Sequence, residues 1–491
     1  MAGHRHRHRP KKRRISELIA SSSPPPPATD APAPDPRSPV AEELRWGQRR
    51  RRSRAGAGGG VDRLSDLPVD IVGDIVSLLP TKEAARTQLL SRHFSQIWAR
   101  APLNLDNLEL PDDDEAFCSA VSRILATHNG PGRVFRVPAH LLHDHGDAMA
   151  GWFDSPALDK LQEMHLCSVH HGRSGPNLLQ RSPVPPASAF RCSSTLRVIN
   201  LSICSVPDGM AQTLSFPKLQ KLALMEVNIS EGSLHGLMAA SPVLDCLMLS
   251  NCFGFRRVRI NSATLRDMAV SASYNYEGMG VICFQEHIIE HAPVLRSFIF
   301  LDENATDLKV SVISAPGLET LGLHCNYKTC SSRFMFGDMV IQGVDVITST
   351  VGISTVKTLS VHLDAVSLDT VIDLMRCFPS LENLYIQCYR PGGTNRWRSK
   401  YRNLLKSLDM RLKTVFLRIF RGTWSEVRFA TFFIFNAKMM ERMVFHGVPC
   451  SDREAFSEKL ELEKRASRGA QFYFKEGHRV EFPYVTYERC P

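Results

Sequence analysis

Apolar residues recur at helical spacing in the segment from Leu67 to Trp98. Pro68 stands where the first turn of a helix tolerates proline, and Pro80 ends that helix. Thr81 is placed to cap a second helix over KEAARTQLL, and a third helix is expected from about Ser91. The apolar stripe of the first helix consists of Ile71, Ile75, Leu78 and Leu79. The inward residues expected of the third helix are Phe94, Ile97 and Trp98. The pattern therefore predicts a packet of three short helices.

A helical packet of this size encloses little core, and domains so small are marginally stable alone. It must therefore pack against the rest of the chain or bury its remaining apolar stripe on a partner. The packet resembles the F-box motif. The resemblance is carried by Leu67-Pro68, Ile75, Leu78-Leu79-Pro80, Leu90-Ser91-Arg92 and Trp98. The following APLNLDNLEL (101–110) resembles the segment that continues many plant F-box proteins.

A second pattern, apolar-x-x-apolar-x-apolar, recurs eleven times between residues 161 and 445. Each copy predicts a strand whose apolar residues point into a core, with polar positions between them facing out. Stacked units of this kind form a parallel sheet along a curved surface, in which each unit covers its neighbour's apolar face. The segments are LQEMHL (161–166), LRVINL (196–201), LQKLAL (219–224), LDCLML (244–249), LRDMAV (265–270), LRSFIF (295–300), LETLGL (318–323), VKTLSV (356–361), LENLYI (381–386), LKTVFL (412–417) and MERMVF (440–445).

Helical returns are expected between some of these strands. GSLHGLMAASPVL (232–244) and LDTVIDLMRCFPSL (368–381) carry the apolar pattern of a helix, followed by a proline before the next strand. The phrases SPVLDCL, APVLRSF, APGLETL and FPSLENL resemble the leucine-rich repeats of plant F-box proteins. A non-repetitive α/β domain would not contain the same Pro-x-Leu-x-x-apolar sequence pattern so often.

The C-terminal part predicts a strand, a turn at Arg421-Gly422, a helix over 425–437, a strand, a charged helix over 454–467 and a last strand in RGAQFYF (468–474). Residues 412–474 resemble the FBD region of plant F-box proteins. Repeat arrays need an atypical last unit that covers their terminal apolar face, and this region is suited to that role.

The expected fold class is therefore α/β. A short three-helix F-box is followed by a curved leucine-rich-repeat solenoid with parallel strands and a C-terminal α/β cap. The expected boundaries are a disordered basic tail rich in Pro, Ser and Gly at 1–60, the F-box at 61–106, the repeats at 107–410 and the FBD-like region at 411–481.

Charge is concentrated in the tail. The chain carries a net charge of +10, and residues 1–60 alone hold fourteen Lys or Arg against five Asp or Glu. The rest is close to neutral, so the high pI is weak support for nucleic-acid binding by the folded part. Two basic clusters are candidate nuclear-localisation signals, with a solvated linker as the alternative. They are Lys11, Lys12, Arg13 and Arg14, and Arg49, Arg50, Arg51 and Arg52. Nucleus, cytoplasm or both are the expected locations.

No motif predicts catalysis, a cofactor or a metal. The sequence has no GxxxxGK[ST], GxSxG or HExxH, and the thirteen cysteines include no CxxC pair, which favours reduced structural thiols. HLCSVHH (165–171) lacks a second ligand pair at zinc-finger spacing. DDDE (112–115) is read as the acidic start of a helix. The longest apolar runs are too short to cross a bilayer, so no membrane partner is expected.

The family resemblance implies a non-catalytic receptor subunit of an SCF-type cullin–RING ubiquitin ligase. In such a complex the F-box binds a Skp-type adaptor, through it cullin and RING subunits, and the repeats hold an unknown protein target. The residues expected to contact the adaptor are Leu67, Pro68, Ile71, Ile75, Leu79, Leu90 and Trp98, and the stripe residues and Trp98 have a competing role as the packet's own core. The alternatives are an adaptor-binding scaffold outside any ligase and a nucleic-acid-associated protein that uses the basic tail.

Overall fold

The computed structural model describes residues 67–107, 110–167, 182–271, 282–302, 307–325, 330–350, 352–393, 395, 410–448 and 453–476. Contacts divide the chain after Asp66, and all of these residues lie in the second unit, which begins at Leu67. The predicted disordered tail and both basic clusters therefore lie outside the described residues.

Three short α-helices form the N-terminal packet, which we define as residues 67–100. They are α2 (Val69–Ser77), α3 (Thr81–Arg86), which continues into the 3₁₀ turn η1 (Thr87–Leu89), and α4 (Arg92–Arg100). Ser91 caps α4 by accepting a hydrogen bond from the backbone N–H of Phe94. The small core of this packet consists of Val72, Val76, Ala84 and Ile97, with Phe94 and Trp98 packed against it.

Thr81 does not cap α3, so that prediction was wrong. Pro80 holds the N-cap position and Thr81 is the first helical residue. The Thr81 hydroxyl donates to the carbonyl oxygen of Asn104 at 2.6 Å and accepts from the backbone N–H of Asp106 at 3.3 Å. The Thr81 side chain thus connects the packet to strand β1 and the residue that follows it, and does not cap α3.

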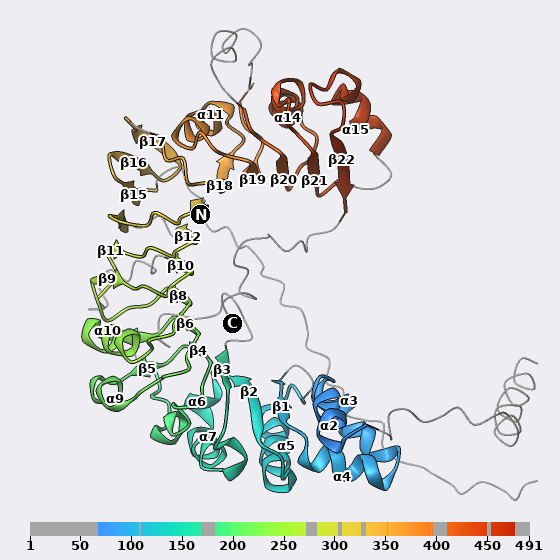
Figure 1. The fold of residues 1–491 in the computed structure, drawn as a ribbon, viewed down its shortest axis with the longest axis vertical. Coiled ribbons are helices and arrows are strands. Elements are labelled where there is room, and N and C mark those ends of the chain that lie inside the picture. The colour runs from blue at the N-terminus through green and yellow to red at the C-terminus, as the bar shows by residue number, and fades with distance from the viewer. Residues whose placement is uncertain are drawn as a thin grey trace, which may run out of the picture. The chain divides into compact units, whose positions relative to one another are not determined.

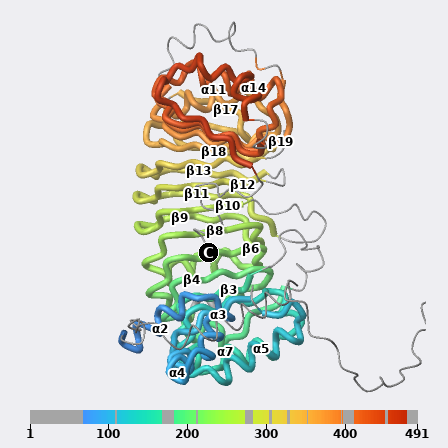
Figure 2. The backbone as a smooth tube through the Cα atoms, turned by 90° about the vertical axis from the view of Figure 1, so that its right-hand side faces the viewer, coloured from blue at the N-terminus to red at the C-terminus, as the bar shows by residue number. Residues whose placement is uncertain are grey.

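A 14-stranded sheet runs through the rest of the described chain, and every neighbouring pair in it is parallel. Its strands follow one another along the inner side of an arc (Figure 1) and appear as successive rungs in Figure 2. In order they are β1 (Leu103–Leu105), β2 (Gly132–Pro138), β3 (Glu163–Cys167), β4 (Val198–Ser202), β6 (Lys221–Met225), β8 (Cys246–Ser250), β10 (Asp267–Ser271), β12 (Ser297–Asp302), β14 (Thr320–Cys325), β18 (Thr358–Ala365), β19 (Asn383–Arg390), β20 (Thr414–Arg418), β21 (Arg442–His446) and β22 (Gln471–Lys475).

All eleven apolar-x-x-apolar-x-apolar segments form strands of this sheet, each strand beginning at the third position of the motif. Their apolar residues pair in register, as Leu222 with Leu247 and Leu247 with Met268, and these side chains are buried in the main core. The expected curved solenoid with parallel strands is therefore confirmed. Strands β1 and β2 precede the first repeat segment and were not predicted.

The outer side of the repeats is built from helices at both ends and from strands in the middle (Figure 1). The helices are α5 (Asp114–Thr127), α6 (Leu141–Asp144), α7 (Gly146–Phe153), α9 (Asp208–Thr213), α10 (Glu231–Ala239) and α11 (Leu368–Cys377), with the 3₁₀ turns η3 (Pro156–Leu158) and η4 (Ala187–Phe190). Both predicted helical returns are present as α10 and α11. Two short strands, β5 (Ser205–Val206) and β7 (Asn228–Ile229), pair beside them.

A second sheet of six strands replaces helices in the middle repeats, and it was not predicted. The segments that form it are four to six residues long and too short to show a helical period, and its first three strands alternate buried positions with more exposed ones. The strands are β9 (Arg257–Asn261), β11 (Glu286–His291), β13 (Lys309–Val312), β15 (Arg333–Phe336), β16 (Met339–Gln342) and β17 (Asp345–Thr348). The first four are parallel, and the last two turn back antiparallel.

The C-terminal elements occur in the predicted order. After β20 come α14 (Trp424–Asn436), β21, α15 (Arg453–Lys459) with the 3₁₀ turn η6 (Leu462–Lys464), and β22. Helix α14 is apolar around most of its circumference, because Phe429, Phe432 and Phe433 are all buried. It covers the end of the main core, as expected of a cap.

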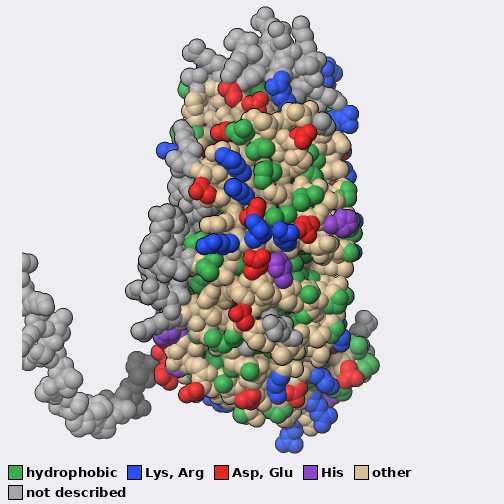
Figure 3. All heavy atoms as spheres, turned by 90° about the vertical axis from the view of Figure 1, so that its left-hand side faces the viewer, with side chains coloured by type: hydrophobic (Ala, Val, Ile, Leu, Met, Phe, Trp, Pro, Cys, Tyr) green, Lys and Arg blue, Asp and Glu red, His purple; other side chains and the backbone are tan. Residues whose placement is uncertain are grey.

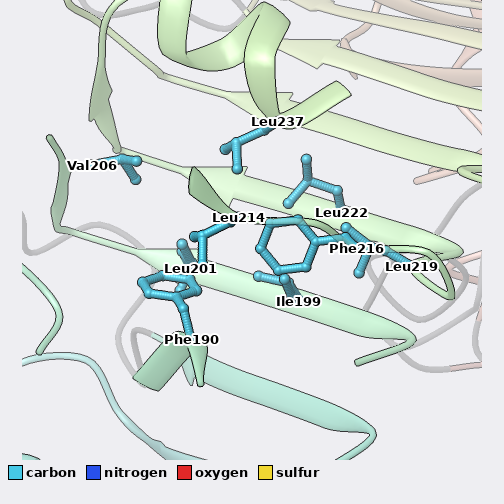
Figure 4. A pocket seen from close by; sticks show the side chains of 9 residues that line it. All are labelled: Phe190, Ile199, Leu201, Val206, Leu214, Phe216, Leu219, Leu222 and Leu237. Atoms are coloured by element: carbon cyan, nitrogen blue, oxygen red, sulfur yellow. The ribbon is translucent and has the colours of Figure 1, made fainter. Parts of the chain in front are cut away.

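A small void remains beneath β4 and β6, and only apolar residues line it. Its volume is about 10 Å³, and Phe190, Phe216 and Leu237 are among the side chains around it (Figure 4). A space of roughly one water molecule needs polar partners to hold water. This void is therefore a packing feature of the core and does not bind a ligand.

Candidate functional site

Exposed apolar side chains gather on the N-terminal packet. Ile71 is 48% exposed, Leu78 77% and Leu90 70%. Single exposed apolar residues are ordinary, but a group of them on so small a packet indicates a protein contact. We define the apolar surface as Leu67, Val69, Ile71, Ile75, Leu78, Leu79, Leu89 and Leu90.

Helix α2 has apolar residues on two faces. Val72 and Val76 are 2% and 3% exposed and face the packet core, whereas Ile71 and Ile75 face outward. Both pairs are four residues apart, so the helical period is satisfied either way. Because the valines already fill the core, the isoleucines remain available to a partner.

Six of the seven residues expected to contact a partner are exposed on the N-terminal packet. Leu67, Ile71, Ile75, Leu79 and Leu90 belong to the apolar surface, and Pro68 holds the exposed N-cap position of α2, where its carbonyl accepts from Val72 N–H at 3.1 Å. Trp98 lies elsewhere: it is half-buried, and its ring meets His128 edge-on at 5.1 Å between centroids.

Sequence reasoning left Val69, Leu78 and Leu89 out of the candidate contact set. Leu78 had been assigned to the helical stripe, but it is the C-cap residue of α2 and projects beyond the helix. Leu89 is 87% exposed at the end of η1, directly before Leu90. An apolar pair in a short turn, with no buried partner at helical spacing, was the signal that could have identified it.

The inner face of the main sheet carries an apolar row, which corrects the expectation that its positions are polar. Ala223, Met248, Ala269 and Ile299 pair in register across four strands. Tyr385, Phe416 and Val444 continue the row farther along. Together with Cys246 these residues form a cluster separate from the main core, because strand side chains alternate between the two faces.

A polar row runs beside it in the C-terminal half. His324, His362, Gln387, Arg418, His446 and Lys475 are register neighbours on six successive strands. The rings of His324 and His362 stack in parallel with centroids 3.7 Å apart, and the Arg418 guanidinium donates to the side-chain amide oxygen Oε1 of Gln387 at 3.0 Å. Burial lowers the pKa of His324 to about 3. Burial is also the largest cause that lowers the pKa of His362, and the neighbouring His324 and Arg418 lower it further. The stacked imidazoles are therefore neutral at neutral pH.

The outer face of the second sheet carries charges of both signs. Arg257 pairs with Glu286 at 2.6 Å, and Arg259 pairs with Glu290 at 3.0 Å. Figure 3 shows Lys and Arg side chains interleaved with Asp and Glu side chains on this face. Such exposed pairs contribute little stability, and the mixed signs do not make the basic stripe typical of a nucleic-acid interface.

The candidate metal-ligating and acidic segments have structural roles where they are described. His165 is buried in β3 and lies 3.5 Å from a carboxylate oxygen of Glu163, while burial raises the pKa of Cys167 to about 11. His170 and His171 lie outside the described residues. Asp113 caps α5 by accepting from the backbone N–H of Ala116 at 2.9 Å, which confirms the acidic helix start. Among the described residues no three His, Cys, Asp or Glu side chains converge as metal ligands, and no helix is both long and apolar enough to traverse a membrane.

Comparison with known proteins accounts for these features. The F-box domain profile matches residues 64–106, and the FBD profile matches residues 401–445. A profile described as FBD-associated F-box protein At5g56370, LRR repeats, matches residues 149–386. The chain therefore carries an F-box domain, leucine-rich repeats similar to those of FBD-associated F-box proteins, and an FBD region. The N-terminal packet is accordingly its F-box, and the arc of strands its leucine-rich repeats.

Three proteins of Arabidopsis thaliana are similar to most of this F-box/LRR/FBD chain. The putative F-box/FBD/LRR-repeat protein At1g66290 is 25% identical over 70% of this chain and 72% of its own length. F-box/LRR-repeat protein 13 is 23% identical over 69% of this chain and 73% of its own. The putative FBD-associated F-box protein At5g22720 is 24% identical over 83% of this chain and 93% of its own.

Proposed function

We propose that this F-box/LRR/FBD protein is the substrate-recognition subunit of an SCF-type cullin–RING ubiquitin ligase. In this proposal the F-box binds a Skp-type adaptor, through which cullin and RING subunits join, and the repeats hold a protein target. The chain performs no chemistry itself. It raises the local concentration of the target at the ubiquitin-transfer machinery.

The observation that carries the proposal is the apolar surface of the F-box. Val72, Val76 and Ile97 complete the packet core, yet eight further apolar side chains remain outside it. A helical packet with such a surplus is suited to docking into an apolar groove of a partner. The neighbouring repeats offer a long inner face on which a different protein can be selected.

The adaptor contact is tested by truncating the outward isoleucines of α2 in the full chain. Burial of one Ile side chain contributes about 1.5–3 kcal/mol, so Ile71→Ala with Ile75→Ala is expected to weaken capture of a recombinant adaptor by roughly 100-fold. Both residues point away from the packet core, so the circular dichroism spectrum should not change. A matched control is Ile313→Ala, because Ile313 is 68% exposed but lies beyond β13 in the repeats. Undiminished capture by the double variant would refute the docking role.

Ligase membership is tested separately from adaptor binding. The full chain is purified from cells with and without proteasome blockade, and co-purifying proteins are identified. A cullin in both samples and a target that accumulates only under blockade support the proposal. Adaptor without cullin, and no blockade-dependent protein, would instead indicate a scaffold that works outside a ligase.

A further inference from the structure

A cavity of about 740 Å³ lies between the F-box and the first helix of the repeat region. One wall comes from α3, η1 and α4, and the other from α5, which stands beside the F-box helices in Figure 1. Leu110 and Pro111, which precede α5 in the chain, also line this space. Its volume is within the range of about 300–1,000 Å³ that small-molecule sites occupy.

The lining of this cavity combines apolar and polar side chains with positive charge. Trp98, Leu110 and Ile124 supply apolar surface, and Lys82 and Arg123 supply cations. None of the described residues that line it is Asp or Glu. Arg123 is exposed and forms no ion pair with another described side chain, so its guanidinium is available to an incoming anion.

Trp98 is held in place on one side of the cavity. Its ring packs edge-on against His128, whose Nε2 is hydrogen-bonded to the carbonyl oxygen of Ala101 at 2.9 Å. Burial lowers the pKa of His128, so the imidazole is neutral at neutral pH and adds no charge. Trp98 also packs against the packet core and the main core, and the part of its indole that lines the cavity offers an apolar surface to an aromatic or aliphatic group.

The two walls are joined by main-chain contacts, so the cavity is preformed. The backbone N–H of Asn129 donates to the carbonyl oxygen of Ala99 at 3.0 Å, linking the end of α5 to α4. Gly130 passes so close that a Cβ there would lie 2.1 Å from the carbonyl oxygen of Ala101. A preformed site loses little conformational entropy when a ligand enters.

We propose that this cavity binds a small organic anion with an apolar body, such as an aryl or alkyl carboxylate. The apolar part lies against Trp98 and Ile124, and the carboxylate meets Arg123. A charge-assisted pair between guanidinium and carboxylate gives specificity for an anion over a neutral molecule of the same shape. Because an occupant touches both walls, binding stabilises the junction between the F-box and the repeats.

The test uses 4-phenylbutyrate and its neutral counterpart 4-phenyl-1-butanol, titrated calorimetrically into the full chain. We expect saturable one-to-one binding of the carboxylate, at least about tenfold tighter than the alcohol, which corresponds to one charge-assisted contact. Arg123→Gln should reduce carboxylate affinity about tenfold and leave alcohol affinity unchanged. Arg92→Gln is the matched control, because Arg92 is an exposed arginine of α4 that does not line the cavity.

A second variant tests the location by volume instead of charge. Ala120→Trp on α5 fills the cavity from its repeat side and should abolish binding of both compounds, while far-ultraviolet circular dichroism reports whether the chain still folds. Equal affinity for the two compounds, unaltered binding by Arg123→Gln, or no saturable binding would each overturn the proposal. Adaptor capture is measured on the same variants, and its persistence in Arg123→Gln shows that a failure here leaves the proposed ligase role intact.

Discussion

His287 is fully buried in β11, and neither ring nitrogen has a hydrogen-bond partner within the described part of the chain. Its ring stacks on Phe298 with centroids 6.0 Å apart and meets Phe284 edge-on. A buried polar group without a partner costs about 1–3 kcal/mol relative to a satisfied one. Burial also lowers the pKa of His287 from its ordinary 6.5 to about 3.

This residue makes folding sensitive to acid. Between pH 6.5 and pH 3 the unfolded chain binds a proton at His287 that the folded chain does not, so the free energy of unfolding falls as the pH falls. We predict that His287→Leu, which nearly preserves volume, raises stability at pH 7 by about 1 kcal/mol. Between pH 7 and pH 5, the free energy of unfolding of this variant should also fall by about 2 kcal/mol less than that of the wild type. Urea unfolding at the two pH values measures both effects.

The control for this prediction is His291→Leu, because His291 is an exposed residue at the end of the same strand. Its substitution should leave the free energy of unfolding at pH 7, and the fall of that free energy between pH 7 and pH 5, unchanged within error. An equal loss of stability on acidification in wild type and His287→Leu would show that His287 does not titrate as stated.

At the scale of single elements, helix starts are set by local polar contacts and helix faces by the surrounding core. Helix α14 begins with a capping box, in which Thr423 Oγ1 accepts from Glu426 N–H and a Glu426 carboxylate oxygen accepts from Thr423 N–H at 2.9 Å. The same carboxylate accepts from Arg421 N–H at 3.1 Å, and Glu426 is 3% exposed. One side chain therefore satisfies several donors at the turn before the helix.

We predict that Glu426→Ala destabilises the C-terminal cap by about 2–3 kcal/mol, since it leaves buried backbone donors without an acceptor. Hydrogen exchange of the backbone amides at 421–436 should accelerate more than that of the F-box amides. Glu463→Ala provides a control in the cap, because Glu463 is exposed in η6. Equal protection at 421–436 in both variants would contradict the role given to Glu426.

The spacing of apolar residues predicted elements better than it predicted their faces. It located α2, but Ile71/Ile75 and Val72/Val76 have the same period, and only contact with Ile97 and Ala84 determines which pair is inside. Thr81 had the identity of a cap, yet its hydroxyl bonds to Asn104, which is distant in sequence. Contacts across such separations leave no local pattern to read.

At the scale of the whole molecule, stability is distributed along an array in which each unit contacts mainly its neighbours. The cap closes that array with aromatic residues: Phe445 is fully buried, stacks on Phe474 at 5.1 Å and meets Phe420 at 4.8 Å. The F-box stands at the opposite end of the strand order, beside β1 and far along the sheet from β21. Damage to the cap should therefore remain local.

We predict that Phe445→Ala costs about 3–5 kcal/mol by leaving a cavity in the cap. Limited proteolysis should cleave first within 412–475, while adaptor capture by the F-box stays within twofold of wild type. Tyr473→Ala, at a position 42% exposed on β22, is the matched control and should leave cleavage unaltered. Loss of adaptor capture in Phe445→Ala would show that the array unfolds as one cooperative unit.

Sequence by itself determined the repeat, because each apolar-x-x-apolar-x-apolar segment carries its strand pattern locally, and the same pattern appears eleven times. It also determined the order of the C-terminal elements and the position of the F-box. The tertiary structure alone decided that the middle repeats return through strands, that the inner sheet face carries an apolar row, and which face of α2 is buried. The physical reason is that local spacing sets which backbone conformation a segment adopts, whereas burial of a given face depends on what lies opposite it in space.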